Sequence, residues 1–283
     1  MNSKGQRAMA LAEEVVLEAR EIILETHSLV KDFNGFIAVD GVSVRVRQGE
    51  IHALIGPNGA GKTTFFNLLT KFLQPTSGTI FYRGRNITRE RPADIARRGV
   101  VRSFQICAVF PHLTVLENVR VALQRNLGTS FYFWRSEKSL ANLDPRAMDL
   151  LAQVHLENHA RTTAADLPYG RKRALELATT LALDPDLMLL DEPTQGMGHE
   201  DVSHVTQLIK QVSANRTVLM VEHNMSVVAS IADTISVLQR GRVIAAGPYA
   251  EVSKNPQVIE AYMGTSSVAL PSTSSDALPG TAS

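Results

Sequence analysis

The sequence predicts an α/β protein, in which a sheet-based core carries an antiparallel β subdomain and an inserted helical subdomain. Short apolar runs alternate with stretches of helical periodicity over most of the 283 residues, as in α/β folds. Near the N-terminus, residues 21–28 and 41–46 alternate apolar and polar side chains, which is typical of antiparallel strands with one solvated face. The block 109–166 instead has helical periodicity, and this predicts the helical subdomain.

The strands expected in the core are short and mostly buried. They comprise His52–Ile55, Leu187–Leu190, Thr217–Val221 and a terminal hairpin of Ile235–Leu238 and Val243–Ala246 that turns at Arg240-Gly241. His52–Ile55 runs into a glycine-rich loop, and a helix is expected from about Gly61.

The chain divides into a central folded unit and two terminal segments. Residues 1–20 form a weakly specified extension, and 266–283 are rich in Ser, Thr, Ala, Pro and Gly, which predicts a disordered tail. Within 21–265, the core is expected to comprise 21–107 and 167–265, and the helical subdomain 108–166.

Composition narrows the classes of function. The chain has 29 basic and 28 acidic side chains, so no overall charge favours a nucleic-acid partner. The single cysteine, Cys107, excludes an intramolecular disulfide and suits a reducing cytoplasm. No stretch has the roughly 18 apolar residues of a spanning helix, and the N-terminus has no secretory signal. We therefore expect a cytoplasmic protein that acts on membranes only through partners.

The strongest motif is the phosphate-loop pattern at 56–63, Gly-Pro-Asn-Gly-Ala-Gly-Lys-Thr. Glycines let backbone N–H groups converge on phosphates, and the following helix offers its positive end to the same anion. In this pattern Lys62 reaches the β- and γ-phosphates and the Thr63 hydroxyl binds Mg²⁺. A structural glycine turn is the alternative, but the preceding strand and following helix favour ATP binding. The expected nucleotide contacts are Asn58, Gly59, Ala60, Gly61, Lys62, Thr63 and Thr64.

A pair of carboxylates, Asp191 and Glu192, follows the apolar strand 187–190. Two acids at a buried strand end are costly unless a cation or a polar reaction centre meets them. In phosphoryl transfer, Asp191 would hold Mg²⁺ directly or through water, and Glu192 would orient and deprotonate the attacking water. Two acids on a solvated strand end are the alternative. Together with the phosphate loop, the pair predicts a nucleotide hydrolase with a P-loop NTPase (RecA-like) core.

Further motifs stand in a fixed order around this site: Lys31-Asp32-Phe33, Val100–Gln105, Leu113–Val119 and Val221-Glu222-His223. With them, 21–264 resembles the ATP-binding subunits of ABC transporters, which implies the ABC ATPase fold. The resemblance implies that Gln105 contacts Mg²⁺ and the attacking water and that His223 senses the γ-phosphate. It also implies that Phe33 stacks on adenine, although Phe36 lies close and can take that role.

The segment 167–173, Leu-Pro-Tyr-Gly-Arg-Lys-Arg, stands where that family has its Leu-Ser-Gly-Gly-Gln signature. The signature caps the γ-phosphate of the opposite subunit, so two subunits sandwich two ATP molecules. Pro168 has neither hydroxyl nor N–H, but proline is tolerated at a helix start, so the N–H groups of Tyr169 and Gly170 can still face the phosphate. Pro168, Tyr169 and Gly170 are therefore candidate nucleotide contacts. The family usually has an aspartate near the position of Gly198, and this aspartate helps to couple the two sites across the dimer.

Three features resemble the branched-chain amino acid uptake subfamily: Tyr169, the string 220–225, and the ending 258–264. The long segment that contains Phe131–Trp134 also fits. The resemblance implies two ATPase subunits, two transmembrane permease subunits and a periplasmic substrate-binding protein, with this chain on the inner face of the plasma membrane. It extends to urea, short-amide and aromatic-acid importers, so the cargo stays open. The segment 105–116 is expected at the joint with the permease.

The altered signature predicts pairing with a second, non-identical ATPase subunit that supplies a complete signature to the ATP bound here; a homodimer is the alternative. Four other functions are alternatives. The nearest is an exporter motor for lipid or lipopolysaccharide. The others are a non-hydrolysing subunit, a soluble ABC ATPase of DNA repair or translation, and a small-molecule kinase, which would need neither Gln105 nor His223.

Overall fold

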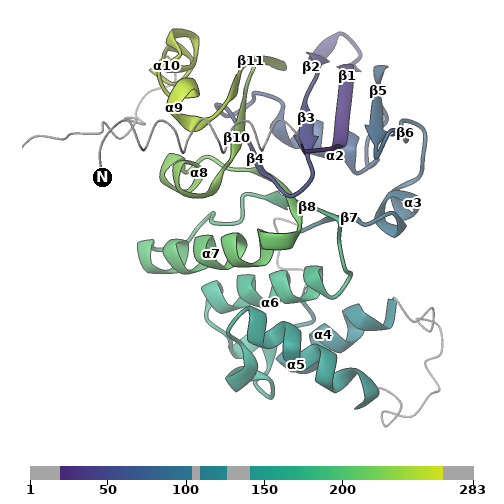
Figure 1. Cartoon of the computed structure of the whole chain (residues 1–283), viewed down its shortest axis with the longest axis vertical. Coiled ribbons are helices and arrows are strands. Elements are labelled where there is room, and N and C mark those ends of the chain that lie inside the picture. The colour runs from purple at the N-terminus through teal and green to yellow at the C-terminus, as the bar shows by residue number, and fades with distance from the viewer. Residues whose placement is uncertain (1–19, 104–108, 126–140, 264–283) are drawn as a thin grey trace, which may run out of the picture.

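A computed structural model describes residues 20–103, 109–125 and 141–263 (Figure 1). Two sheets lie at one end of the molecule, and α4 (Val115–Gln124) and α5 (Asp144–Gln153) lie at the other. The predictions for Gln105, for Phe131–Trp134 and for the two terminal segments fall outside the described residues.

The first sheet has six strands in the order β11-β10-β4-β9-β8-β7. The pairs from β10 to β7 are parallel, and β11 is antiparallel to β10. The bounds are β4 Ile51–Ile55, β7 Val100–Arg102, β8 Leu187–Asp191, β9 Thr217–Val221, β10 Thr234–Gln239 and β11 Arg242–Gly247. All the core strands expected from the sequence are confirmed, including the hairpin turn at Arg240-Gly241, where both residues have positive φ.

The second sheet is antiparallel, with the path β2-β1-β5-β6 and with β3 paired to β1. Its strands are β1 Ile22–Phe33, β2 Phe36–Val42, β3 Arg45–Arg47, β5 Ser77–Tyr82 and β6 Arg85–Asn86. Antiparallel strands here are confirmed, but their predicted extents are wrong. β1 continues past Ser28, whose φ is 44°, because the register against β5 shifts between His27 and Val30. The second predicted strand is divided between the end of β2 and β3.

The helices flank the six-stranded sheet and build the separate helical layer. Besides α4 and α5 they are α2 Lys62–Leu69, α3 Pro92–Arg97, α6 Tyr169–Leu181, α7 His199–Val212, α8 Met225–Ile231, α9 Tyr249–Val252 and α10 Pro256–Met263. A capping box between Thr114 and Glu117 begins α4. α6 packs against α4 and α5 on one side and α7 on the other, so it connects the helical layer to the core (Figure 1).

Alternation along the strands fills a core on each face of the six-stranded sheet. In β4, Ala53 and Ile55 join one cluster with the helices α4 to α8, whereas Leu54 joins the other. This second cluster contains Phe65 and Phe66 of α2, which lies between the two sheets. Both phenylalanines are fully buried, and each burial contributes roughly 1.5–3 kcal/mol. The first helix after the phosphate loop is thus fixed by packing on both sides.

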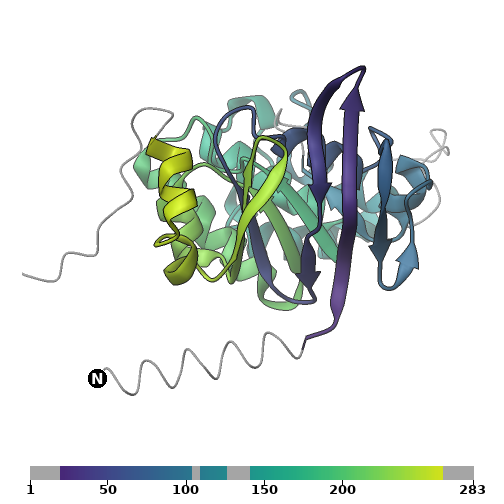
Figure 2. The same cartoon turned by 90° about the horizontal axis from the view of Figure 1, so that it is seen from above.

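The carboxyl ends of β4, β9, β8 and β7 meet at one edge of the sheet, because these strands are parallel neighbours. The phosphate loop follows β4, Glu222-His223 follows β9, and Glu192 follows β8. Such an edge is where open α/β sheets bind ligands. Viewed from above, the long β1–β2 hairpin crosses beside this sheet, with α9 and α10 to one side of it and β5 and β6 to the other (Figure 2). None of the described helices has the length and apolar character needed to cross a bilayer.

Candidate nucleotide-binding and hydrolysis site

Glycine is required at both ends of the phosphate loop. Gly56 and Gly61 have φ of 150° and 102°, where side chains are strained. A Cβ on Gly56 would lie 2.1 Å from the Leu238 carbonyl oxygen, and one on Gly61 would lie 2.3 Å from that of Ala38. The loop therefore packs directly on backbone at both ends, and within it the Ala60 N–H donates to the Pro57 carbonyl oxygen at 3.2 Å.

Helix α2 begins at Lys62 with an uncapped N-terminus. Its N-cap, Gly61, offers no side-chain acceptor, and its first turn has no acidic residue. An anion bound there would meet open N–H groups and the positive end of the helix. Thr63 is exposed in the first turn, which is the position expected for a metal-binding hydroxyl.

Lys62 lies folded along the loop. Its Nζ donates to the carbonyl oxygens of Gly56 at 2.7 Å and Pro57 at 3.0 Å. Burial lowers the pKa of Lys62, and the nearby carboxylates of Glu192 and Asp191 act in the opposite direction. Lys62 and the two acids thus share one electrostatic environment, although the lysine begins α2 and the acids stand at the end of β8.

Asp191 is buried, and its two oxygens differ. Arg102 Nη2 donates to Oδ2 at 2.5 Å. Among the described residues, no donor reaches the buried Oδ1. A buried carboxylate oxygen without a partner fits a hard cation, and Mg²⁺ commonly takes only one or two protein oxygens alongside phosphates and water. Thr63 and Asp191 can therefore hold Mg²⁺ with ATP.

Glu192 begins the loop after β8 in a left-handed conformation, with φ of 47°. Its N–H donates to the Val221 carbonyl oxygen at 2.9 Å, which ties the β8 end to the β9 end. Its carboxylate is partly exposed and lies 4.0 Å from His223 Nδ1, too long for a direct hydrogen bond. The two predicted catalytic side chains therefore meet from neighbouring strands, on the solvent side of the site.

Glu222 organises these loops, and sequence reasoning assigned it no role. It is fully buried, and its Oε1 accepts from the backbone N–H and the hydroxyl of Thr194. Its Oε2 accepts from the N–H groups of His223 at 2.7 Å and Asn224 at 3.0 Å. One carboxylate therefore holds both the loop after Glu192 and the loop that carries His223. An acid directly after an apolar strand was the available signal.

Phe33 and Phe36 face each other across the turn that joins β1 and β2. Both are exposed, and Lys31 Nζ lies 5.0 Å from the Phe33 ring centroid. The hairpin reaches the phosphate loop, because β2 packs on α2 and the Ala38 carbonyl oxygen abuts Gly61. Either aromatic ring is available as an adenine platform beside the loop.

The altered signature opens α6 as expected. Pro168 is the N-cap, with φ of −57°, and helical geometry begins at Tyr169. A Cβ on Gly170 would lie 2.5 Å from Asp201 Oδ1, so the signature packs tightly on the first turn of α7. The N–H groups at the start of α6 have no side-chain cap and can face a phosphate.

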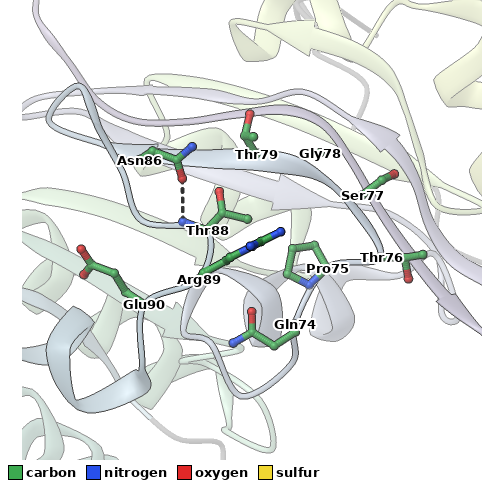
Figure 3. A pocket seen from close by; sticks show the side chains of 10 residues that line it. All are labelled: Gln74, Pro75, Thr76, Ser77, Gly78, Thr79, Asn86, Thr88, Arg89 and Glu90. Carbon is green, nitrogen blue, oxygen red and sulfur yellow. Dashed lines mark hydrogen bonds between the residues drawn. The ribbon is translucent and has the colours of Figure 1, made fainter.

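Two hollows near the sheets differ in their relation to this site. A cavity of about 930 Å³ between β5, β6 and the segment before α3 is lined by polar, partly exposed side chains (Figure 3). It does not include any phosphate-loop residue. A second cavity, of about 290 Å³, is lined by 57–60 of the loop and by Glu260 and Ala261 of α10. Only the second one adjoins the nucleotide site.

Helix α10 also contacts the phosphate loop through Tyr262, and no sequence pattern indicated this contact. The buried Tyr262 hydroxyl lies close to the backbone of Gly56. Burial raises the pKa of Tyr262 to about 12, so the hydroxyl stays protonated at neutral pH. The C-terminal helix therefore touches the first residue of the phosphate loop.

Together, a glycine loop that opens a helix, a buried lysine and two carboxylates at the end of β8, on the same edge of the sheet, define a phosphate-loop nucleotide hydrolase. A family model described as ABC transporter matches 39–195, and one described as Branched-chain amino acid ATP-binding cassette transporter matches 242–267. The chain therefore belongs to the ABC transporter family, and as an ATP-binding cassette of that family it is an ATPase.

Relatives match along nearly their whole length. The high-affinity branched-chain amino acid transport ATP-binding protein LivG of Salmonella typhimurium is 39% identical over 86% of this chain and 98% of its own. BraF of Pseudomonas aeruginosa, named for the same transport, is 40% identical with the same coverage. Among solved structures, an ATP-binding cassette of an ABC transporter in its ADP conformation superposes with a TM-score of 0.76 at 30% identity, over 86% of this chain and 99% of that one. The ABC ATPase fold predicted from the sequence is confirmed.

Proposed function

We propose that this chain is the ATP-hydrolysing subunit of an importer for branched-chain amino acids or related small solutes. The observation that carries this is the C-terminal match at 242–267, together with relatives of 37–40% identity that are named for branched-chain amino acid transport. An exporter of lipid or lipopolysaccharide is not supported, because these relatives have transport of amino acids in their names. The chain would act on the cytoplasmic face of the membrane, through permease subunits.

The roles of the site residues follow from their chemistry and, for Gln105, His223 and Phe33, from the resemblance to the family. Lys62 and the loop N–H groups bind the phosphates, and Phe33 or Phe36 stacks on adenine. Thr63, Asp191 and Gln105 would hold Mg²⁺, which would neutralise charge on the phosphates. Glu192 takes a proton from the attacking water, which lies between Glu192 and His223. His223 contacts the γ-phosphate. Glu222 keeps the loops of Glu192 and His223 at a fixed separation.

The other half of the ATP site belongs to a second ATPase subunit. The signature of this chain starts with Pro168 at the N-cap and offers backbone N–H groups but no serine hydroxyl. A non-identical partner would place a complete signature on the ATP bound by this chain, which would make this the main hydrolytic site. The ATP bound by the partner would face the altered signature of this chain, and that site would be weaker. The proposal of a heteromeric pair is supported by this asymmetry and by the intact Glu192 and His223.

A groove beside the predicted joint segment suits a permease subunit. A cavity of about 270 Å³ lies between the end of β7, α4 and α6. Phe110 and Val121 are exposed apolar side chains on its rim, and Arg102 and Ser103 form its β7 end. Ser103 leads directly into the segment of Gln105. A permease helix seated in this groove would contact the end of β7, and β7 lies next to β8, whose end carries Asp191 and Glu192. Closure of the ATPase pair has to be transmitted to the permease at such a position.

Reconstitution tests the proposal. The chain, a partner ATPase and candidate permease subunits in proteoliposomes, with the binding protein, should import labelled leucine or a related solute in an ATP-dependent manner. Phe110→Asp should abolish the stimulation of ATPase activity by the permease, because it places a charge in an apolar interface. Ala229→Asp, on the exposed surface of α8, is the matched control. Equal stimulation in both variants would show that the groove is not the joint.

A further inference from the structure

Arg102 lies beside the proposed metal site, and the mechanism above gives it no task. It is the last residue of β7, and its side chain is only 10% exposed. Its Nη2 donates to Asp191 Oδ2 at 2.5 Å, and its Nη1 donates to Asn67 Oδ1 at 2.6 Å. The guanidinium also lies over the Phe66 ring, 5.7 Å from its centroid. Two partners and one ring on α2 and β8 therefore fix the orientation of this side chain.

The pairing with Arg102 occupies one carboxylate oxygen of Asp191 and leaves the other for a different partner. Asp191 is 1% exposed, and a carboxylate buried to this extent needs a partner of opposite charge. Arg102 satisfies Oδ2 and leaves Oδ1 without a donor among the described side chains. Lys62 is the other cation near Asp191, but its Nζ donates to the carbonyl oxygens of Gly56 and Pro57. The carboxylate is thus clamped at one oxygen and open at the other.

We infer that Arg102 is a positioning residue for the metal: it fixes the Asp191 carboxylate so that Oδ1 faces the Mg²⁺ that accompanies ATP, and Asn67 holds Arg102 in place. This deepens the proposed function and rests on it. A purely structural ion pair would satisfy both oxygens, whereas here the second oxygen is buried and unpartnered. Partners that orient a metal ligand typically set metal affinity by 10–100-fold. Arg102 also lines the permease groove, so the clamp joins that surface to the metal ligand.

Binding of Mn²⁺, as a spectroscopic substitute for Mg²⁺, tests this inference in the full-length chain without turnover. Electron paramagnetic resonance would follow Mn²⁺ binding at a saturating concentration of a non-hydrolysable ATP analogue, and nucleotide binding would be measured separately without metal. Arg102→Met should weaken Mn²⁺ binding about tenfold or more while metal-free nucleotide binding stays unchanged. Arg102→Lys should restore part of the affinity, because an ammonium can reach Oδ2 but cannot also bind Asn67 as a fork.

Asn67→Ala keeps the pair of Arg102 with Asp191 but removes the hydrogen bond that holds Arg102, so we expect a smaller loss of Mn²⁺ affinity. If Arg102→Met does not fold, Asn67→Ala provides the test. Arg98→Met is the control, because Arg98 also pairs with a carboxylate, that of Glu90, away from the site. Unchanged or tighter Mn²⁺ binding in Arg102→Met and Asn67→Ala would overturn the inference and leave the proposed function intact. Failure of the wild-type chain to bind the ATP analogue at all would overturn both.

Discussion

The Tyr169 hydroxyl donates to the Gln195 carbonyl oxygen at 3.2 Å, so the signature of this chain is tied to the loop that follows its own Glu192. The same hydroxyl accepts from Arg173 Nη2 at 3.2 Å, and Arg173 is itself paired with Glu176 at 2.8 Å. Gln195 N–H donates to the Glu192 carbonyl oxygen at 3.1 Å, which closes the loop. In the proposed dimer the signature serves the opposite ATP and Glu192 serves this one. In that dimer the hydrogen bond would connect the two sites within one subunit, close to Gly198.

Tyr169→Phe should reduce turnover of the assembled transporter several-fold without changing ATP binding by the isolated chain. Phenylalanine keeps the ring on which Arg173 stacks and removes only the hydroxyl, and a single exposed hydrogen bond contributes roughly 0.5–1.5 kcal/mol. Steady-state kinetics of the complex would separate the effect on kcat from that on KM. Tyr249→Phe, on α9, is the control, and equal kinetics in both variants would deny Tyr169 a coupling role.

Gly61→Ala should destabilise the nucleotide-free chain by more than about 3 kcal/mol, because its Cβ would lie 2.3 Å from a backbone oxygen and φ is 102°. Gly59→Ala shares the loop and a φ of 78°, but nothing lies within 4 Å of its Cβ. Backbone strain alone should cost it roughly 1–2 kcal/mol. Urea unfolding of the apo protein compares the two. Similar losses would mean that the loop can move away from Ala38.

Lys71 is buried, and no partner for its Nζ lies among the described residues. Burial lowers the pKa of Lys71 from 10.5 to about 8, against an opposing effect of Glu90. Below pH 8 both folded and unfolded chains carry the proton, and the full penalty of burying the charge applies. Between about pH 8 and 10.5 the unfolded chain binds more protons, so stability rises with pH.

Lys71→Met should therefore stabilise the protein at pH 7 by up to about 3 kcal/mol, and the gain should shrink toward zero near pH 10.5. Methionine meets the same positive φ as lysine, so backbone strain is unchanged. Chemical unfolding at pH 7 and pH 10 measures the difference, with the exposed Lys254→Met as control. A gain of the same size at both pH values would assign it to packing instead of charge.

The sequence predicted the elements whose signal is local. The phosphate loop, the strand that ends at Asp191 and the hairpin at Arg240-Gly241 each have their pattern within a few residues. The extent of β1 was missed because a register shift near Ser28 lets the strand continue. Partnerships across the fold were missed as well. Arg102 meets Asn67 and Asp191 from 35 and 89 residues away, and no local pattern encodes which side chains tertiary packing brings together.

The most direct test of the central claim is the ATPase activity of Glu192→Gln, reconstituted with a partner ATPase and permease subunits. Removing a positioned general base should lower turnover on the order of 10²-fold or more while ATP binding persists. The exposed Glu157→Gln is the control. Loss of turnover with ATP trapped in the complex is the result predicted here. Unchanged turnover in a complex that still transports would contradict the claim, because hydrolysis would then take place at the partner's site.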